Sequence, residues 1–161
     1  MQDDLLRSLA DALNAKGWML TTAESCTGGW IAKLCTDLAG SSAWFERGFV
    51  TYSNEAKQDM LGVREETLAQ YGAVSEAVTA EMAAGALLHS RAQVAVSVSG
   101  IAGPGGGTAS KPVGTVCFGW ALQGGKVRTA THRFEGDREA VRRQSVEYAL
   151  NGVLHLLDTP L

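Results

Sequence analysis

The longest uncharged stretch of the chain, Ala92 to Ser110, places the strongest constraint on its fold. It contains Val94 to Val98, where valine alternates with alanine and serine, a pattern typical of an interior strand. It then runs into Gly103-Pro104-Gly105-Gly106-Gly107, which would break a membrane helix. The stretch therefore indicates a buried strand followed by a loop, and not a transmembrane segment.

The rest of the chain alternates between helical and strand patterns. Leucines at 5, 6, 9 and 13 predict a first helix over 3–16. Further helices are predicted over 30–38, 54–61, 65–71, 76–89 and 137–157, and further strands over 18–22, 49–52, 113–122 and 127–134. The last two strands flank Gln123-Gly124-Gly125 and form a hairpin. We therefore predict a single-domain α/β sandwich over residues 1–161, with a mixed sheet and flanking helices.

Composition bounds the partners and the compartment. The formal net charge is −3 and no run of like charges occurs, so nothing suggests binding to nucleic acid or to an anionic membrane. Charged residues near the start, such as Asp3, Asp4 and Arg7, argue against a secretory signal. The three cysteines form no C-x-x-C pair, and an odd number suits a reducing compartment. We expect a cytoplasmic protein.

Several common catalytic signatures are missing. The chain has no G-x-S-x-G elbow and no complete P-loop, because Lys111 is followed by Pro112. The histidines, His89, His132 and His155, do not have the spacing of metal ligands. We expect no metal.

The first of three small-residue turns is Ser25-Cys26-Thr27-Gly28-Gly29, between a predicted strand and a predicted helix. A helix N-terminus offers free N–H groups and partial positive charge, which suit a phosphate or an oxyanion. The alternative is a tight, capped strand-to-helix turn without a ligand.

The second turn is Gly40-Ser41-Ser42, which Tyr52 and Lys57 follow in the chain. A serine becomes a nucleophile when a neighbour takes its proton, and a neutral lysine can be that base. A tyrosine hydroxyl can relay the proton or hold the lysine. The alternative is that Ser42 caps a helix, Tyr52 belongs to the core and Lys57 is solvated.

The third turn runs from Ser99 to Thr108 and is rich in glycine. Its backbone N–H groups can surround an anion, and its glycines let a ligand approach the backbone. It follows a buried strand, where α/β sheets tend to place ligands. The alternative is a flexible surface loop.

Taken together, these segments resemble the CinA C-terminal domain family. The resemblance rests on Thr22 to Gly29, Gly40-Ser41-Ser42, Tyr52 to Lys57, Ser99 to Pro104, Lys111 to Val116 and Gly136-Asp137-Arg138, in order over about residues 5 to 155. It implies hydrolysis of the carboxamide of nicotinamide mononucleotide, which gives nicotinic acid mononucleotide and ammonia, in pyridine nucleotide salvage. It also implies no cofactor and a homodimer.

On this resemblance we predict that Ser42 attacks the carboxamide carbon, with Lys57 as general base and Tyr52 relaying the proton. Ser25 and backbone N–H groups would stabilise the oxyanion. The residues predicted to bind the substrate are Glu24, Cys26, Thr27, Gly28, Gly100, Ala102, Gly103, Thr108 and Arg142. Arg142 would hold the phosphate, with Arg138 and Arg143 as rivals.

The nucleophile stays open at this point. Ser25 could itself attack, with Lys57 reaching across, and Cys26 is a third candidate because a helix N-terminus can lower the pKa of a thiol. Two readings without catalysis also remain: a nucleotide-binding regulatory module linked to competence or to the DNA damage response, and a structural or partner-binding domain that supports DNA uptake or repair.

Overall fold

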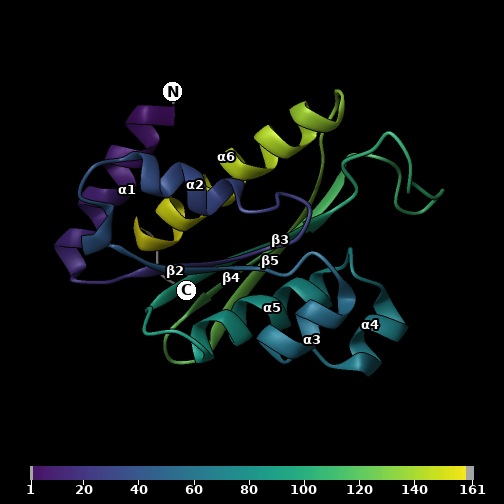
Figure 1. Cartoon of the computed structure of the whole chain (residues 1–161), viewed down its shortest axis with the longest axis horizontal. Coiled ribbons are helices and arrows are strands. Elements are labelled where there is room, and N and C mark those ends of the chain that lie inside the picture. The colour runs from purple at the N-terminus through teal and green to yellow at the C-terminus, as the bar shows by residue number, and fades with distance from the viewer. Residues whose placement is uncertain (1, 159–161) are drawn as a thin grey trace.

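A computed structural model describes residues 2–158. These residues form a mixed five-stranded sheet that helices cover on both faces (Figure 1). The strands are β1 (Leu20–Glu24), β2 (Phe45–Val50), β3 (Val94–Gly100), β4 (Thr115–Leu122) and β5 (Lys126–Arg133). The helices are α1 (Gln2–Lys16), α2 (Trp30–Asp37), α3 (Asn54–Leu61), α4 (Glu65–Tyr71), α5 (Glu76–Leu88) and α6 (Arg138–Asp158), with a short 3₁₀ helix, η1, at Ser41–Ala43.

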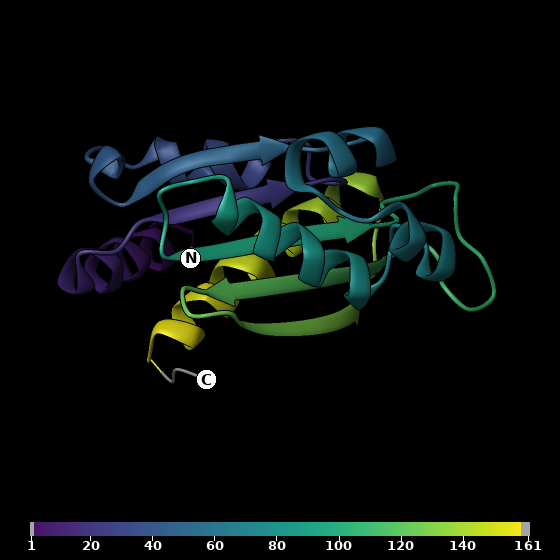
Figure 2. The same cartoon turned by 90° about the horizontal axis from the view of Figure 1, so that it is seen from below.

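The strand order is β2-β1-β3-β4-β5, which can be followed across Figure 2. β2, β1 and β3 are parallel, and the β3–β4 and β4–β5 pairs are antiparallel. The carboxyl ends of β1, β2 and β3 therefore meet at one edge of the sheet. The segments that follow them, beginning at Ser25, Thr51 and Ile101, start side by side at this edge.

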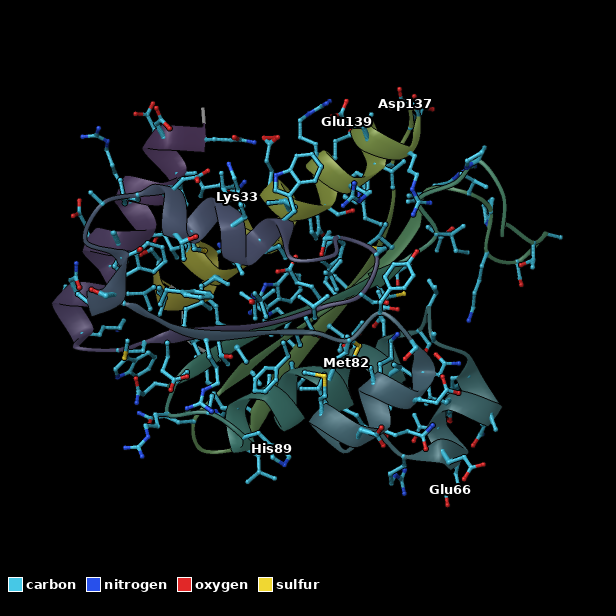
Figure 3. The ribbon with its side chains drawn as sticks, viewed as in Figure 1. Lys33, Glu66, Met82, His89, Asp137 and Glu139 are labelled. Carbon is cyan, nitrogen blue, oxygen red and sulfur yellow. The ribbon has the colours of Figure 1, made fainter. Side chains whose placement is uncertain are left out.

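The two faces of the sheet carry separate cores. α1, α2 and α6 cover one face, and α3, α4 and α5 cover the other (Figure 1). Alternate residues of β3 divide between them: Val94, Val96 and Val98 lie in the first core, and Ala95 lies in the second. Met82 of α5 belongs to the second core, and Figure 3 shows it between that helix and the sheet. Full burial of a valine or methionine side chain in these cores contributes roughly 1.5–3 kcal/mol to the stability of the fold.

A close contact between α3 and α5 sets the position of α3. A Cβ atom added at Gly85 of α5 would lie 1.9 Å from the carbonyl oxygen of Leu61, the last residue of α3. Only glycine lets the two backbones approach this closely. Because Lys57 lies one helical turn before Leu61, this contact fixes how far Lys57 reaches toward the sheet.

The predicted α/β sandwich with a mixed sheet and flanking helices is confirmed. The bounds of α3 and α4 agree with the prediction, but β1 lies two residues later than predicted. Trp18 donates its backbone N–H to the Leu13 carbonyl and so caps the end of α1 instead of joining the strand. β2 begins at Phe45, earlier than the predicted strand over 49–52. The sequence pattern missed its first residues because they lie partly exposed at the sheet edge and form no apolar run. None of the helices within residues 2–158 is both long and apolar enough to cross a membrane.

Candidate active site

Lys57 and Ser25 meet at the carboxyl edge of the sheet. The Nζ atom of Lys57 lies 3.0 Å from the Oγ atom of Ser25, and also 3.1 Å from the carbonyl oxygen of Thr51 and 3.4 Å from that of Tyr52. A neutral amine can donate to both carbonyls and use its lone pair to accept the Ser25 proton. The three neighbours thus suit an amine that serves as a base.

The surroundings of Lys57 favour this neutral form. Its side chain is 1% exposed. Burial lowers the pKa of the Lys57 amine from 10.5, and the negative charges of Glu55 and of Cys26, when ionised, offset part of that decrease. No carboxylate oxygen within residues 2–158 forms an ion pair with Nζ. A larger fraction of the amine is therefore unprotonated near neutral pH than for a solvated lysine.

Glu24 holds the turn that presents Ser25. Its buried carboxylate accepts hydrogen bonds from the Thr27 hydroxyl at 2.6 Å and from the backbone N–H groups of Ile31 at 2.9 Å and Ala32 at 3.0 Å. The last two lie in the first turn of α2, where a negative charge is favourable. The N–H groups predicted to bind a ligand are thus partly engaged by Glu24.

Arg142 holds the same turn from α6. Its guanidinium donates to the carbonyl oxygens of Cys26 at 3.0 Å and Thr27 at 3.1 Å, and lies 5.3 Å from the centre of the Trp30 ring. With Gly28 it lines a separate surface recess over the start of α2. The structure thus places Arg142 and Gly28 outside the lining of the cleft beside Lys57, and the predicted roles of both in binding the substrate stay predictions.

A cleft of about 250 Å³ opens beside Ser25 and Lys57. Its walls come from the segments after β1, β2 and β3, from the α4–α5 connection and from the start of α6. The lining residues are Ser25, Cys26, Tyr52, Asn54, Lys57, Ala73, Val74, Ser99, Gly100, Ala102 and Arg138.

Ser42 does not reach this cleft. It is exposed on η1, which precedes β2, whereas Ser25 follows β1. Because β1 and β2 are parallel, with Leu20 opposite Phe45 and Glu24 opposite Val50, the two serines lie at opposite ends of the strands. Five strand residues span about 16 Å. The prediction that Ser42 lies beside Lys57 is therefore wrong.

Tyr52 contributes its backbone more than its hydroxyl. Its carbonyl oxygen lies 3.4 Å from both Nζ of Lys57 and Oγ of Ser25. Its ring is 63% exposed, which contradicts a place in the core, and its hydroxyl accepts a hydrogen bond from Arg138 at 3.4 Å. Arg138 also donates to the Gly103 carbonyl at 2.7 Å and is the arginine that lines the cleft.

The other predicted binding residues divide between the cleft and its supports. Gly100 and Ala102 line the cleft, and Gly103 holds Arg138 through its carbonyl. Thr108 is exposed at the tip of the loop, where its hydroxyl accepts the Lys111 N–H, so it lies outside the lining. Burial raises the pKa of the Cys26 thiol to about 11, which keeps it protonated at neutral pH.

Four residues that line the cleft were not among the predicted catalytic or binding residues: Asn54, Ala73, Val74 and Ser99. A signal existed only for Ser99, since the alternation along β3 places it on the same face as Ser97. The α4–α5 connection carries no chemical motif and is brought to the cleft by packing alone. Within residues 2–158, no group of three His, Cys, Asp or Glu side chains could hold a metal ion.

Comparisons with known proteins agree with this fold. A family model described as the CinA C-terminal domain matches residues 2–157. The nicotinamide-nucleotide amidohydrolase PncC of Escherichia coli is 65% identical over 146 residues, covering 91% of this chain and 88% of that protein. Its counterpart in Pseudomonas putida is 52% identical, covering 94% of each.

Solved structures extend the comparison to three dimensions. The competence damage-inducible protein A of Klebsiella pneumoniae superposes with a TM-score of 0.95 at 44% identity, covering 99% of both chains. The competence/damage inducible protein CihA of Agrobacterium tumefaciens gives 0.93 at 48% identity, covering 98% of this chain and 96% of that one. The chain therefore belongs to the CinA C-terminal domain family.

Proposed function

We propose that this protein is a nicotinamide-nucleotide amidohydrolase that uses Ser25 as nucleophile and Lys57 as general base. The observation that carries the proposal is the 3.0 Å contact between Lys57 Nζ and Ser25 Oγ, at a cleft large enough to admit a carboxamide. The similarity to proteins named nicotinamide-nucleotide amidohydrolase supports the choice of substrate.

In the first step Ser25 Oγ bonds to the carboxamide carbon and its proton passes to Lys57 Nζ. The tetrahedral intermediate then breaks its C–N bond, and Lys57 returns the proton to the departing nitrogen, which leaves as ammonia. In the second step Lys57 takes a proton from water as the oxygen of that water attacks the acyl-enzyme. The C–O bond to Ser25 then breaks, Lys57 returns the proton to Ser25 Oγ, and nicotinic acid mononucleotide leaves.

The oxyanion needs donors close to Ser25. The backbone N–H of Cys26, which follows the nucleophile, makes no hydrogen bond to an oxygen of residues 2–158. The N–H of Ser25 is already engaged with the Val98 carbonyl. We assign the Cys26 N–H as an oxyanion donor, a contact that would strengthen as negative charge develops on the substrate oxygen.

The ribose phosphate would extend from Ser25 toward Arg138 and the Gly100 to Gly103 segment. Arg138 lies at the start of α6, where the helix dipole also favours an anion. A guanidinium can bind phosphate through two parallel hydrogen bonds. This assigns to Arg138 the phosphate contact that the sequence alone favoured for Arg142.

The proposal is tested with purified protein and nicotinamide mononucleotide. We expect ammonia and nicotinic acid mononucleotide to appear in equal amounts, and rapid quenching to trap an ester on the peptide that contains Ser25. Binding of the mononucleotide without ammonia release would contradict the proposal and favour a regulatory nucleotide-binding module.

The cellular setting follows from the resemblance to the family. We propose that the protein works in the cytoplasm as a homodimer in pyridine nucleotide salvage, without nucleic acid as a partner. Sedimentation analysis tests the dimer. The net charge of −3 gives no reason to expect binding to DNA. Tight, salt-sensitive binding to DNA would contradict the absence of a nucleic-acid partner.

A further inference from the structure

Ser97 and Ser99 of β3 lie on the same face of the sheet but have different surroundings, because residues two apart in a strand share a face. The Ser97 hydroxyl donates to the Thr79 carbonyl at 2.6 Å and lies 3.4 Å from the Gly119 carbonyl. The Ser99 hydroxyl makes no hydrogen bond to any residue within 2–158, although Ser99 is only 1% exposed. Within residues 2–158 the Thr22 hydroxyl alone is fully enclosed without a partner, so the Ser99 oxygen is not fully enclosed, and Ser99 lines the open space of the cleft.

The side chain of Ser99 is directed to the same cleft as Ser25. β1 and β3 are parallel with Glu24 opposite Val98, and the Ser25 N–H donates to the Val98 carbonyl at 3.1 Å. Ser25 and Ser99 are thus neighbours on adjacent strands, with Cα atoms about 5 Å apart. Both point to the face covered by α3 and α5, and both line the cleft.

Thr22 provides the contrast within the same sheet. Its hydroxyl has no partner either, but it is fully enclosed and lies on the opposite face, in contact range of Gly48 and away from the cleft lining. Ser99 therefore combines an unengaged hydroxyl with access to the space beside the nucleophile.

The chemistry of the cleft shows which substrate group Ser99 would meet. The lining supplies donors, including the Lys57 amine and the Arg138 guanidinium, but contains no carboxylate. A carboxamide seated against Ser25 brings two N–H donors that need acceptors. The Ser99 oxygen is a buried acceptor within reach of that position, whereas Asn54 is exposed.

We propose that the Ser99 Oγ atom accepts a hydrogen bond from the carboxamide N–H of the substrate and so makes the enzyme prefer an amide over an ester. This inference rests on the proposed function. It makes Ser99 a specificity-determining residue, separate from the Ser25 and Lys57 pair that performs the reaction.

The experiment compares kcat/KM for nicotinamide mononucleotide with kcat/KM for the methyl ester of nicotinic acid mononucleotide. Ser99→Ala should lose about 10- to 100-fold on the amide and little on the ester. Ser99→Cys, which is close in size but a weak acceptor, should shift the ratio in the same direction. Ser97→Ala is the matched control: it removes a hydroxyl from the same face and should leave the amide-to-ester ratio as in the wild type.

Equal losses on both substrates, or full amide turnover by Ser99→Ala, would overturn the role of Ser99 while leaving the proposed function intact. A wild-type protein that releases no ammonia from the mononucleotide would instead overturn the proposed function and this inference together. Circular dichroism on each variant verifies that the fold is retained.

Discussion

Glu24 and Ser25 are adjacent in the sequence but serve opposite faces of the sheet. The Glu24 carboxylate accepts hydrogen bonds from the first turn of α2, whereas the Ser25 hydroxyl contacts Lys57 of α3. Because the side chains of successive residues alternate, a single strand end anchors one helical layer and presents the proposed nucleophile to the other. The geometry of the Ser25 and Lys57 pair therefore depends on how firmly Glu24 is held.

Replacing Glu24 with Gln tests this dependence. The amide has nearly the same size, but its NH₂ group faces N–H donors where a carboxylate oxygen accepted them, so one donor loses its partner. We expect unfolding free energy to fall by about 1–3 kcal/mol and kcat to fall as the Ser25 turn shifts. Urea denaturation and ammonia release measure the two effects. Unchanged stability would show that Glu24 does not anchor the turn.

The identity of the nucleophile is tested by paired serine variants. Ser25→Ala should lower kcat by several orders of magnitude, because it removes the atom that bonds to the substrate. Ser42→Ala should keep activity close to that of the wild type, since Ser42 lies at the far end of the strands. The measurement is steady-state ammonia release by both variants at matched protein concentration. The reverse pattern would exclude Ser25 as nucleophile.

The lowered pKa of Lys57 predicts how activity depends on pH. Only the unprotonated amine can take the Ser25 proton, so kcat/KM should rise with pH up to the pKa of Lys57 and then level off. Because burial lowers that pKa below 10.5, the half-maximal rate should be reached below pH 10.5. A rate profile recorded across this range gives the value. A half-maximal rate at or above pH 10.5 would contradict a buried base with a lowered pKa.

The same shift predicts how stability depends on pH. Between the lowered native pKa of Lys57 and the unfolded value of 10.5, the unfolded chain binds a proton that the native protein does not, so stability rises with pH there. Below the native pKa the cost of burying the charge is fully present. Lys57→Met, which carries no such cost, should therefore exceed the wild type in stability most at low pH, and the difference should shrink toward 10.5. Thermal unfolding at several pH values measures it, and a difference independent of pH would count against the assignment.

Two arginines one helical turn apart should differ in their effects. Arg138→Gln should raise KM for the mononucleotide and reduce its advantage over the riboside, which lacks the phosphate. Arg142→Gln should instead lower kcat and stability, because it releases the Cys26 and Thr27 carbonyls. Kinetics on both substrates separate the roles. Loss of phosphate discrimination in Arg142→Gln alone would restore the original assignment.

The sequence determined the fold class and two of the segments that line the cleft. Local periodicity and turn residues indicated the α/β alternation, and the segments after β1 and β3 were identified because glycine and small polar residues follow buried strands. These are local properties, so they can be derived from neighbouring residues alone. Lys57 was also predicted as the base from the sequence, and the structure buries it beside Ser25.

Only the tertiary structure decided which serine meets Lys57. Both Ser25 and Ser42 lie in small-residue turns, but the parallel pairing of β1 and β2 sends them to opposite ends of the sheet. The choice between Arg138 and Arg142 likewise depends on where α6 begins relative to the turn at Cys26. Ser99 entered the site through the pairing of β1 with β3. Such contacts join residues far apart in the chain, and no local pattern specifies them.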